Sequence, residues 1–109
     1  MAVIKPGSVV ICEFPYTDGS RTKTRPVLVL STRGSEDFIG SLITTASFPD
    51  SIPLTKKEFV SGGLKVEPCY LVPLRVSAVS KSIIKKEAGI VHHSVLTQAI
   101  KALVDALGK

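Results

Sequence analysis

Apolar residues along this chain gather in short runs, which are separated by proline, glycine and polar residues. The first run, residues 8–14, has apolar side chains at nearly every position, which is typical of a strand buried on both faces. Residues 25–30 and 38–46 predict two further strands, and Pro26 stands at the start of its run, where a strand tolerates the missing N–H. Residues 15–24 are polar and predict a loop. The first half of the chain therefore predicts three strands.

The middle of the chain predicts shorter and less regular elements. Residues 52–54 predict a short strand, and two consecutive glycines predict a turn within residues 59–63. Residues 64–75 predict a further strand, in which Pro68 and Pro73 favour an edge position or a bulge.

Two more segments complete the strand predictions. Residues 76–79 continue or bend the strand before them, and residues 82–90 fit either a short strand or a helical turn. The pattern of the second segment leaves both interpretations open.

The last segment predicts an amphipathic helix. Apolar residues recur there at helical spacing, namely Leu96, Ile100, Leu103 and Leu107, with Val104 beside them. Ser94 predicts the N-cap, and Gly108 predicts the C-terminal stop. Several strands followed by one packing helix indicate a single mainly β domain over residues 1–109. A small barrel or curled sheet is favoured because it leaves few open edges.

Composition narrows the class of protein. The 109 residues are 44% hydrophobic, and tryptophan is absent, so valine, isoleucine and leucine must fill the core. These values exclude collagen-like, coiled-coil and disordered chains. Fourteen Lys and Arg against nine Asp and Glu give a net charge of +5, which suits a polyanionic partner. Cys12 and Cys69 lie far apart, and the chain has no stretch of 18 apolar residues, so we expect a reduced, cytoplasmic protein.

Catalytic and metal-binding motifs are scarce. The chain has no GxSxG, HExxH or P-loop sequence. His92 and His93 are adjacent and point in different directions, so we expect them to be solvated and expect no metal site. We expect Cys12 to be an inert core residue and Cys69 to be unreactive, because no base stands beside it in the sequence. The Lys85-Lys86 pair is typical of a solvated face.

Arg25 is the most informative polar residue. Pro26 favours an extended backbone at Arg25, which places the guanidinium beside Arg21 and Lys23 in a cluster suited to phosphate oxygens. The ordinary alternative is a surface arginine paired with a carboxylate. A threonine hydroxyl at the end of the 38–46 strand could also bind a phosphate.

Several blocks of the sequence together resemble the MazF/PemK toxins of bacterial toxin–antitoxin systems. The blocks are residues 6–15 (PGSVVICEFP), 17–20 (TDGS), 24–31 (TRPVLVLS), 37–45 (DFIGSLITT), 62–65 (GGLK), 68–71 (PCYL), the stretch 83–90 and the terminal helix. They occur in the family's order and cover nearly the whole chain. The resemblance implies an SH3-like barrel, a homodimer and metal-independent, sequence-specific cleavage of single-stranded mRNA. It also implies a cognate antitoxin as protein partner and no cofactor.

The same resemblance suggests the site residues. Arg25 matches the family's catalytic arginine and Thr44 its catalytic threonine, with Thr45 as the alternative if the register shifts by one. Gly19 and Ser20 match the substrate-facing loop. The further residues expected to bind substrate are Arg21, Lys23 and Thr45. The 2′-hydroxyl of the RNA is the nucleophile in this chemistry, so the protein needs only to orient the phosphate and stabilise its charge.

One departure from the family pattern concerns the general base. Many members have an arginine and, two residues later, an acidic residue where this chain has Val72 and Leu74, with Arg75 just beyond. Either the base is dispensable, or Glu13 or Asp18 replaces it, or the protein is weakly active or inactive. The competing function is therefore a non-catalytic binder on the same fold, which binds RNA or inhibits a topoisomerase.

Overall fold

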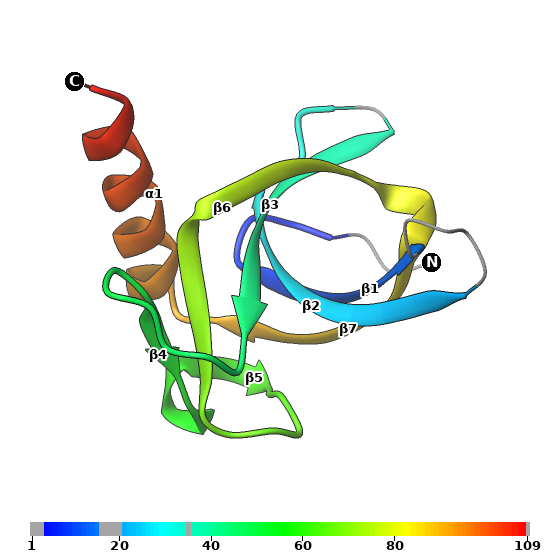
Figure 1. Cartoon of the computed structure of the whole chain (residues 1–109), viewed down its shortest axis with the longest axis horizontal. Coiled ribbons are helices and arrows are strands. Elements are labelled where there is room, and N and C mark those ends of the chain that lie inside the picture. The colour runs from blue at the N-terminus through cyan, green and yellow to red at the C-terminus, as the bar shows by residue number, and fades with distance from the viewer. Residues whose placement is uncertain (1–3, 16–20, 35, 109) are drawn as a thin grey trace.

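The strands that the apolar runs predict form one antiparallel sheet in the computed structural model, which describes residues 4–15, 21–34 and 36–108 (Figure 1). Its strands are β1 (Ser8–Pro15), β2 (Thr22–Ser31), β3 (Asp37–Thr44), β4 (Ile52–Leu54), β5 (Phe59–Gly62), β6 (Cys69–Ser80) and β7 (Ile84–Val91). Two 3-10 turns, η1 (Lys56–Glu58) and η2 (Lys81–Ile83), precede β5 and β7, and the helix α1 (His93–Leu107) follows β7. The mainly β class with a C-terminal helix is confirmed.

The sheet curls into a nearly closed barrel. Its strand order is β4-β6-β3-β2-β1-β7-β5, so β4 and β5 are the two edges. Figure 1 shows β1, β2, β3, β6 and β7 curving around a common centre, with α1 beside the end where β6 bends. Both edge strands contribute side chains to the same core cluster, as does α1. This arrangement confirms the curled sheet with few open edges.

Side chains on both faces of the central strands are buried. Along β1, Val9 belongs to one core cluster and Val10 to the other, and along β2, Leu28 and Val29 divide in the same way. Adjacent residues of a strand point to opposite faces, so two cores, one on each side of the sheet, explain the continuous apolar runs. The prediction that the first strand is buried on both faces is confirmed, and the structure adds β2.

The bulge predicted around Pro73 is present. The register between β3 and β6 jumps from Ser41↔Val76 to Ile43↔Leu71, so residues 72–75 have no direct partner on β3. Pro73 is fully buried, and the Ser41 hydroxyl donates a hydrogen bond to its carbonyl oxygen at 3.2 Å. β6 is nevertheless an interior strand between β4 and β3, because the bulge accommodates the proline that a regular ladder would exclude.

The prediction of a turn at residues 59–63 is wrong. Phe59–Gly62 forms β5, which pairs with β7, and Gly62 has a φ of +69° within that strand. The next strand accordingly begins at Cys69 rather than at residue 64. The turn signal of the two glycines reflects a backbone conformation inside a strand and not the end of a hairpin.

Other boundaries also differ from expectation. The loop predicted over residues 15–24 is shorter, because Pro15 and Thr22 already face each other in the β1–β2 ladder. The sequence left residues 82–90 open between a short strand and a helical turn. The structure contains both, because this segment includes the end of the 3-10 turn η2 and then β7.

The helix begins and packs differently from the prediction. Its N-cap is His92, which makes no side-chain capping bond, so Ser94 lies in the first turn instead of at the cap. Gly108 is the C-cap, as predicted, and its N–H donates to the carbonyl of Val104. Only Val95, Leu96 and Ala99 are buried on α1, and Leu103 in the next turn packs half-buried against the same core. The remaining apolar positions are half-buried or exposed, and Leu107 is 75% exposed.

Candidate functional site

The sheet register brings Arg25 and Thr44 onto one face. The β2–β3 ladder ends with Val27 opposite Leu42, and Arg25 and Thr44 each lie two residues beyond that last pair. Residues two apart along a strand point to the same face, and directly opposite residues also share a face. Arg25 and Thr44, which are far apart in the sequence, therefore lie on adjacent strands and on the same face of the sheet.

The same row of residues extends across two more strands. Thr44 lies opposite Tyr70 of β6, and Tyr70 lies opposite Pro53 of β4. We call Arg25, Thr44, Tyr70 and Pro53 the Arg25 row. Their neighbours along β4 and β6, such as Ile52 and Leu71, belong to the core on the other face of the sheet. Thr44 and Tyr70 are half-buried and Pro53 is exposed, so the row opens towards solvent at its β4 end.

Arg25 has no charged partner among the residues that the structure describes. Its side chain is half-buried, and within the described residues it forms neither a hydrogen bond nor an ion pair. Its partner across the β1–β2 ladder is Cys12, whose pKa is raised to about 11 because burial disfavours the thiolate. Among the described residues, Arg25 is therefore not the arginine paired with a carboxylate that was the alternative. A half-buried guanidinium of this kind is suited to binding a phosphate.

The Thr44 hydroxyl is oriented by the turn that follows β3. Its oxygen accepts the N–H of Ala46 at 3.3 Å. Because the oxygen accepts that bond, the hydroxyl proton remains available to donate to a ligand. Arg25 and Thr44 can thus present several donors on the same face of the sheet.

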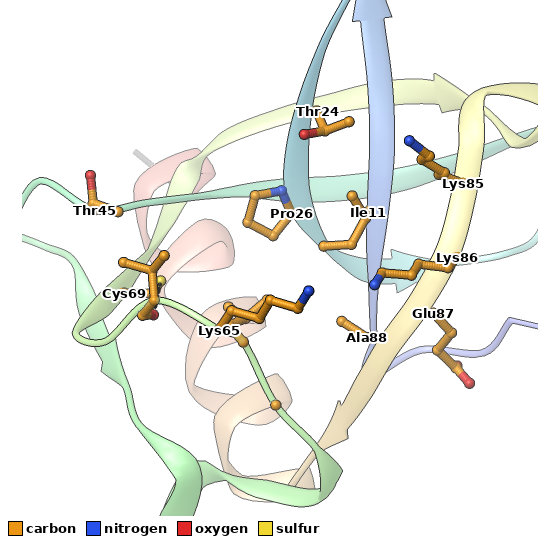
Figure 2. Close-up of a pocket in the computed structure, with 13 residues that line it drawn as sticks. Ile11, Thr24, Pro26, Thr45, Lys65, Cys69, Lys85, Lys86, Glu87 and Ala88 are labelled. Atoms are coloured by element: carbon orange, nitrogen blue, oxygen red, sulfur yellow. Dashed lines mark hydrogen bonds between the residues drawn. The ribbon is translucent and has the colours of Figure 1, made fainter.

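Thr45 lies on the other side of the sheet, in a groove of about 580 Å³. Thr24 and Pro26, the two residues that flank Arg25 in the sequence, also line this groove, whereas Arg25 and Thr44 do not. Figure 2 shows Lys65 and Lys86 reaching into the groove from opposite sides. Its other lining residues are Ile11, Gly63, Leu64, Val66, Cys69, Lys85, Glu87 and Ala88. The structure therefore separates Thr45 from the Arg25 row and gives the protein a second basic surface.

The expected substrate-binding residues of β2 lie near Arg25. Lys23 is exposed and two residues before Arg25, so it belongs to the same face, opposite Phe14 of β1. Arg21 is exposed and immediately precedes the strand. Gly19 and Ser20 lie outside the described residues, as do the alternative base Asp18 and the aromatic Tyr16. Among the described residues that we expected to bind substrate, Lys23 is thus the one closest to Arg25 along β2.

Glu13 does not stand beside Arg25. It faces Thr24 across the β1–β2 ladder, on the groove side of the sheet. Its carboxylate accepts a hydrogen bond from the Thr22 hydroxyl at 3.1 Å and lies 3.8 Å from the Lys85 ammonium. Since Glu13 is on the opposite face and already has partners, it is not placed to act as a base at the Arg25 row.

The histidines and cysteines show no reactive arrangement in the part of the chain that the structure describes. His92 and His93 are exposed at the start of α1, as expected. Cys69 is buried, burial raises its pKa, and its thiol donates to the carbonyl of Val66 at 2.8 Å. Both thiols are thus buried with raised pKa values, which is consistent with the expectation that they are inert. No group of three or more potential metal ligands occurs among residues 4–15, 21–34 and 36–108, and no helix there is long and apolar enough to cross a membrane.

Comparison with known proteins identifies the family. Residues 5–107 match the family described as PemK-like, MazF-like toxin of type II toxin-antitoxin system. This chain belongs to that family. No curated protein matches it by sequence.

Several solved structures share the fold. A MazE-MazF structure from Deinococcus radiodurans superposes with a TM-score of 0.80 at 20% identity, covering 99% of this chain and 98% of that one. An endoribonuclease in complex with its cognate antitoxin, from a mycobacterial species, gives a TM-score of 0.73 at 20% identity and covers 99% and 96%. The Mycobacterium tuberculosis toxin MazF-mt6 gives 0.69 at 16% identity and covers 93% and 96%.

The bulge of β6 contains the departure from the expected family pattern. Leu74, where the resemblance led us to expect an acidic residue, is 47% exposed. Arg75 follows it, with its guanidinium carbon 4.6 Å from the centroid of the Phe48 ring. The bulge thus presents an apolar side chain and a cation but no carboxylate.

Tyr70 is the residue at the site that sequence reasoning missed. The sequence shows it only as a member of the 68–71 block, because its place beside Thr44 depends on a strand pairing across 26 positions of the chain. The one available signal was the aromatic side chain at a polar end of an apolar strand, which composition alone does not distinguish from a core residue.

Proposed function

We propose that this protein is an endoribonuclease toxin that cleaves single-stranded mRNA at specific sequences without a metal ion. The observation that supports it most directly is that Arg25, which has no partner among the described residues, lies on the same face of the sheet as the Thr44 hydroxyl. Family membership supports the reaction class. The shared face of these two residues adds a physical reason for their roles.

The proposed reaction uses the substrate's own nucleophile. The RNA 2′-oxygen attacks the adjacent phosphorus, the bond from phosphorus to the 5′-oxygen breaks, and a 2′,3′-cyclic phosphate and a 5′-hydroxyl form. Arg25 donates two hydrogen bonds to the non-bridging oxygens, and Thr44 donates a third, which stabilises the charge of the pentacoordinate transition state. Arg25 acts electrostatically, since an arginine pKa above about 12 makes it a poor proton donor. The 2′-hydroxyl proton leaves to water, and water protonates the departing 5′-oxygen.

We further propose the assembly that the family implies. The protein acts in the cytoplasm as a homodimer, and a cognate antitoxin neutralises it by occupying the RNA-binding surface. The solved MazE-MazF structures of the same fold support a protein partner of this kind. Sedimentation of the purified chain, alone and with the antitoxin encoded beside it, tests both statements.

The deciding experiment is digestion of a long single-stranded RNA in excess EDTA. Wild type should give discrete cuts that end in cyclic phosphate, and Arg25→Ala should slow cleavage roughly 100-fold or more, as removal of a positioned oxyanion donor does. Arg33→Ala is the matched control, because Arg33 is an exposed arginine beyond the other end of β2. Circular dichroism confirms that each variant folds. Cleavage that Arg25→Ala retains, or that EDTA abolishes, would contradict the proposal.

A non-catalytic binder remains the second candidate, favoured by Leu74 in place of an acidic residue and by the lysine-lined groove. It predicts that folded wild type binds RNA, or inhibits a topoisomerase, and makes no cut at any concentration. The digestion distinguishes the two functions directly.

A further inference from the structure

Tyr70 occupies the position next to Thr44 in the Arg25 row. The β3–β6 ladder places Thr44 and Tyr70 directly opposite each other. Neighbouring strands are about 4.8 Å apart, so the Tyr70 backbone is about one strand spacing from Thr44, and Arg25 lies on the same face of the next strand, β2. A ligand phosphate held by Arg25 and Thr44 would therefore have an aromatic ring beside it.

The Tyr70 side chain has no evident structural role in either core. It belongs to neither of the two core clusters, whereas Cys69 and Leu71 on either side of it pack into the core on the opposite face. Within the described residues, its hydroxyl makes no hydrogen bond. Its partner on the outer side is the exposed Pro53 of the edge strand β4. The ring and the proline thus form a small apolar surface at the open end of a row whose other end is a cation.

This combination suits one nucleotide unit of a single strand. The phosphate is anionic and the base has an apolar π face, and aromatic side chains bind unpaired bases by stacking regardless of base identity. We propose that Tyr70, flanked by Pro53, stacks a nucleobase next to the scissile phosphate and so positions the RNA on Arg25 and Thr44. The proposal rests on the proposed ribonuclease function. It makes Tyr70 a positioning residue, whose ring is required and whose hydroxyl is dispensable.

The test compares Tyr70→Leu, which removes the ring, with Tyr70→Phe, which removes only the hydroxyl. The RNA carries 2-aminopurine beside the mapped cut and a 2′-deoxy nucleotide at the cut, so that it binds without being cleaved. If wild type makes no cut, no cut position is known, and a set of uncleavable RNAs then carries 2-aminopurine at successive positions. Quenching of the 2-aminopurine fluorescence reports stacking of the base. Titration of the uncleavable RNA with protein gives Kd, and steady-state cleavage of normal RNA gives kcat and KM. Thermal unfolding checks the fold of both variants.

We expect Tyr70→Leu to raise Kd and KM by about 5- to 100-fold, as loss of one stacked base does, and to abolish the quenching. Tyr70→Phe should stay within about twofold of wild type in both constants and keep the quenching. An equal loss in both variants would overturn the proposal, since it would assign the role to the hydroxyl. Unchanged Kd and quenching in Tyr70→Leu would overturn it as well.

Failure of the proposed function gives a different result. If wild type cuts RNA and Tyr70→Leu binds and cuts equally well, the ribonuclease stands and the stacking role falls. If wild type makes no cut, the ribonuclease falls, and the fluorescence of the uncleavable RNA still decides whether Tyr70 stacks a base. Absence of any RNA binding by wild type overturns both.

Discussion

At the residue scale, Thr44 and Thr45 are adjacent in the sequence but lie on opposite sides of the sheet. Thr44→Ala removes a donor beside Arg25, so we expect RNA cleavage to fall by roughly 100-fold. Thr45→Ala removes a similar hydroxyl from the groove side and should change cleavage by less than about twofold. Initial rates with the two variants and with Thr44→Ser, which keeps the hydroxyl, provide the measurement. A larger loss in Thr45→Ala would mean that the groove and not the Arg25 row holds the scissile phosphate.

The buried thiol of Cys12 predicts a pH dependence of stability. Its pKa is about 11 in the folded chain, against 9.0 for an unperturbed thiol, because burial disfavours the thiolate. Between these values the unfolded chain binds fewer protons than the folded chain, so the free energy of unfolding falls as pH rises. From pH 8 to pH 10.5 we expect Cys12 to account for a loss of roughly 2 kcal/mol. Urea unfolding at the two pH values should show that loss in wild type and a smaller one in Cys12→Ala. Equal losses in both proteins would refute the assignment.

At the scale of elements, the close approach of β5 to β7 requires a glycine at position 89. A Cβ on Gly89 would lie 2.5 Å from the carbonyl oxygen of Ser61 and 2.9 Å from the amide nitrogen of Gly63. Since β5 is an edge strand held only by β7, Gly89→Ala should displace it and lower the free energy of unfolding by roughly 1–3 kcal/mol. Gly63→Ala is the control, because the nearest atom to its Cβ is Cγ of Lys56 at 3.9 Å. Urea denaturation should find the control within about 0.5 kcal/mol of wild type. Equal destabilisation by both substitutions would show that the close approach of β5 to β7 is not the cause.

At the scale of the whole molecule, the chain has a net charge of +5, and its lysines include residues on both faces of the sheet. Lys23 stands on the face of Arg25, whereas Lys86 points into the groove on the other side (Figure 2). If RNA follows the Arg25 face, Lys23→Ala should weaken binding of uncleavable RNA. It should also lower the slope of log Kd against log salt by about 0.7 for each phosphate that the lysine no longer neutralises. Lys86→Ala should leave both quantities unchanged. Titrations at a series of salt concentrations measure them, and a reduced slope in Lys86→Ala would place RNA in the groove.

Much of the fold could be predicted from the apolar runs, because a strand buried on both faces needs apolar residues at consecutive positions. Pro73 likewise predicted its bulge, since a proline interrupts a ladder whatever surrounds it. The wrong predictions have a common cause. A residue type that is typical of a turn or of a helix cap can also occur in another part of the fold. Gly62 resembles a turn residue, but its positive φ serves a strand that approaches Ala88 and Gly89 closely. Ser94 resembles an N-cap, but the chain already enters the helix at His92, directly after β7 ends.

The candidate site likewise contains residues that the sequence could predict and residues that it could not. Arg25 and Thr44 could be proposed because they lie in sequence blocks that resemble the family, and their roles remain predictions. Tyr70 could not be proposed, nor could Glu13 be set aside, because the sequence shows that side chains alternate along a strand but not which residues of other strands lie opposite.

The sequence by itself therefore determined the class of fold and the positions of most strands, because burial and backbone preference act over a few residues. Arg25 and Thr44 were predicted from the resemblance of their sequence blocks to the family. Only the tertiary structure decided that Arg25, Thr44 and Tyr70 share a face and that Thr45, Glu13 and the groove lysines lie on the other. The physical reason is strand register: it is set by packing across the whole sheet, and a shift of one residue would exchange the two faces.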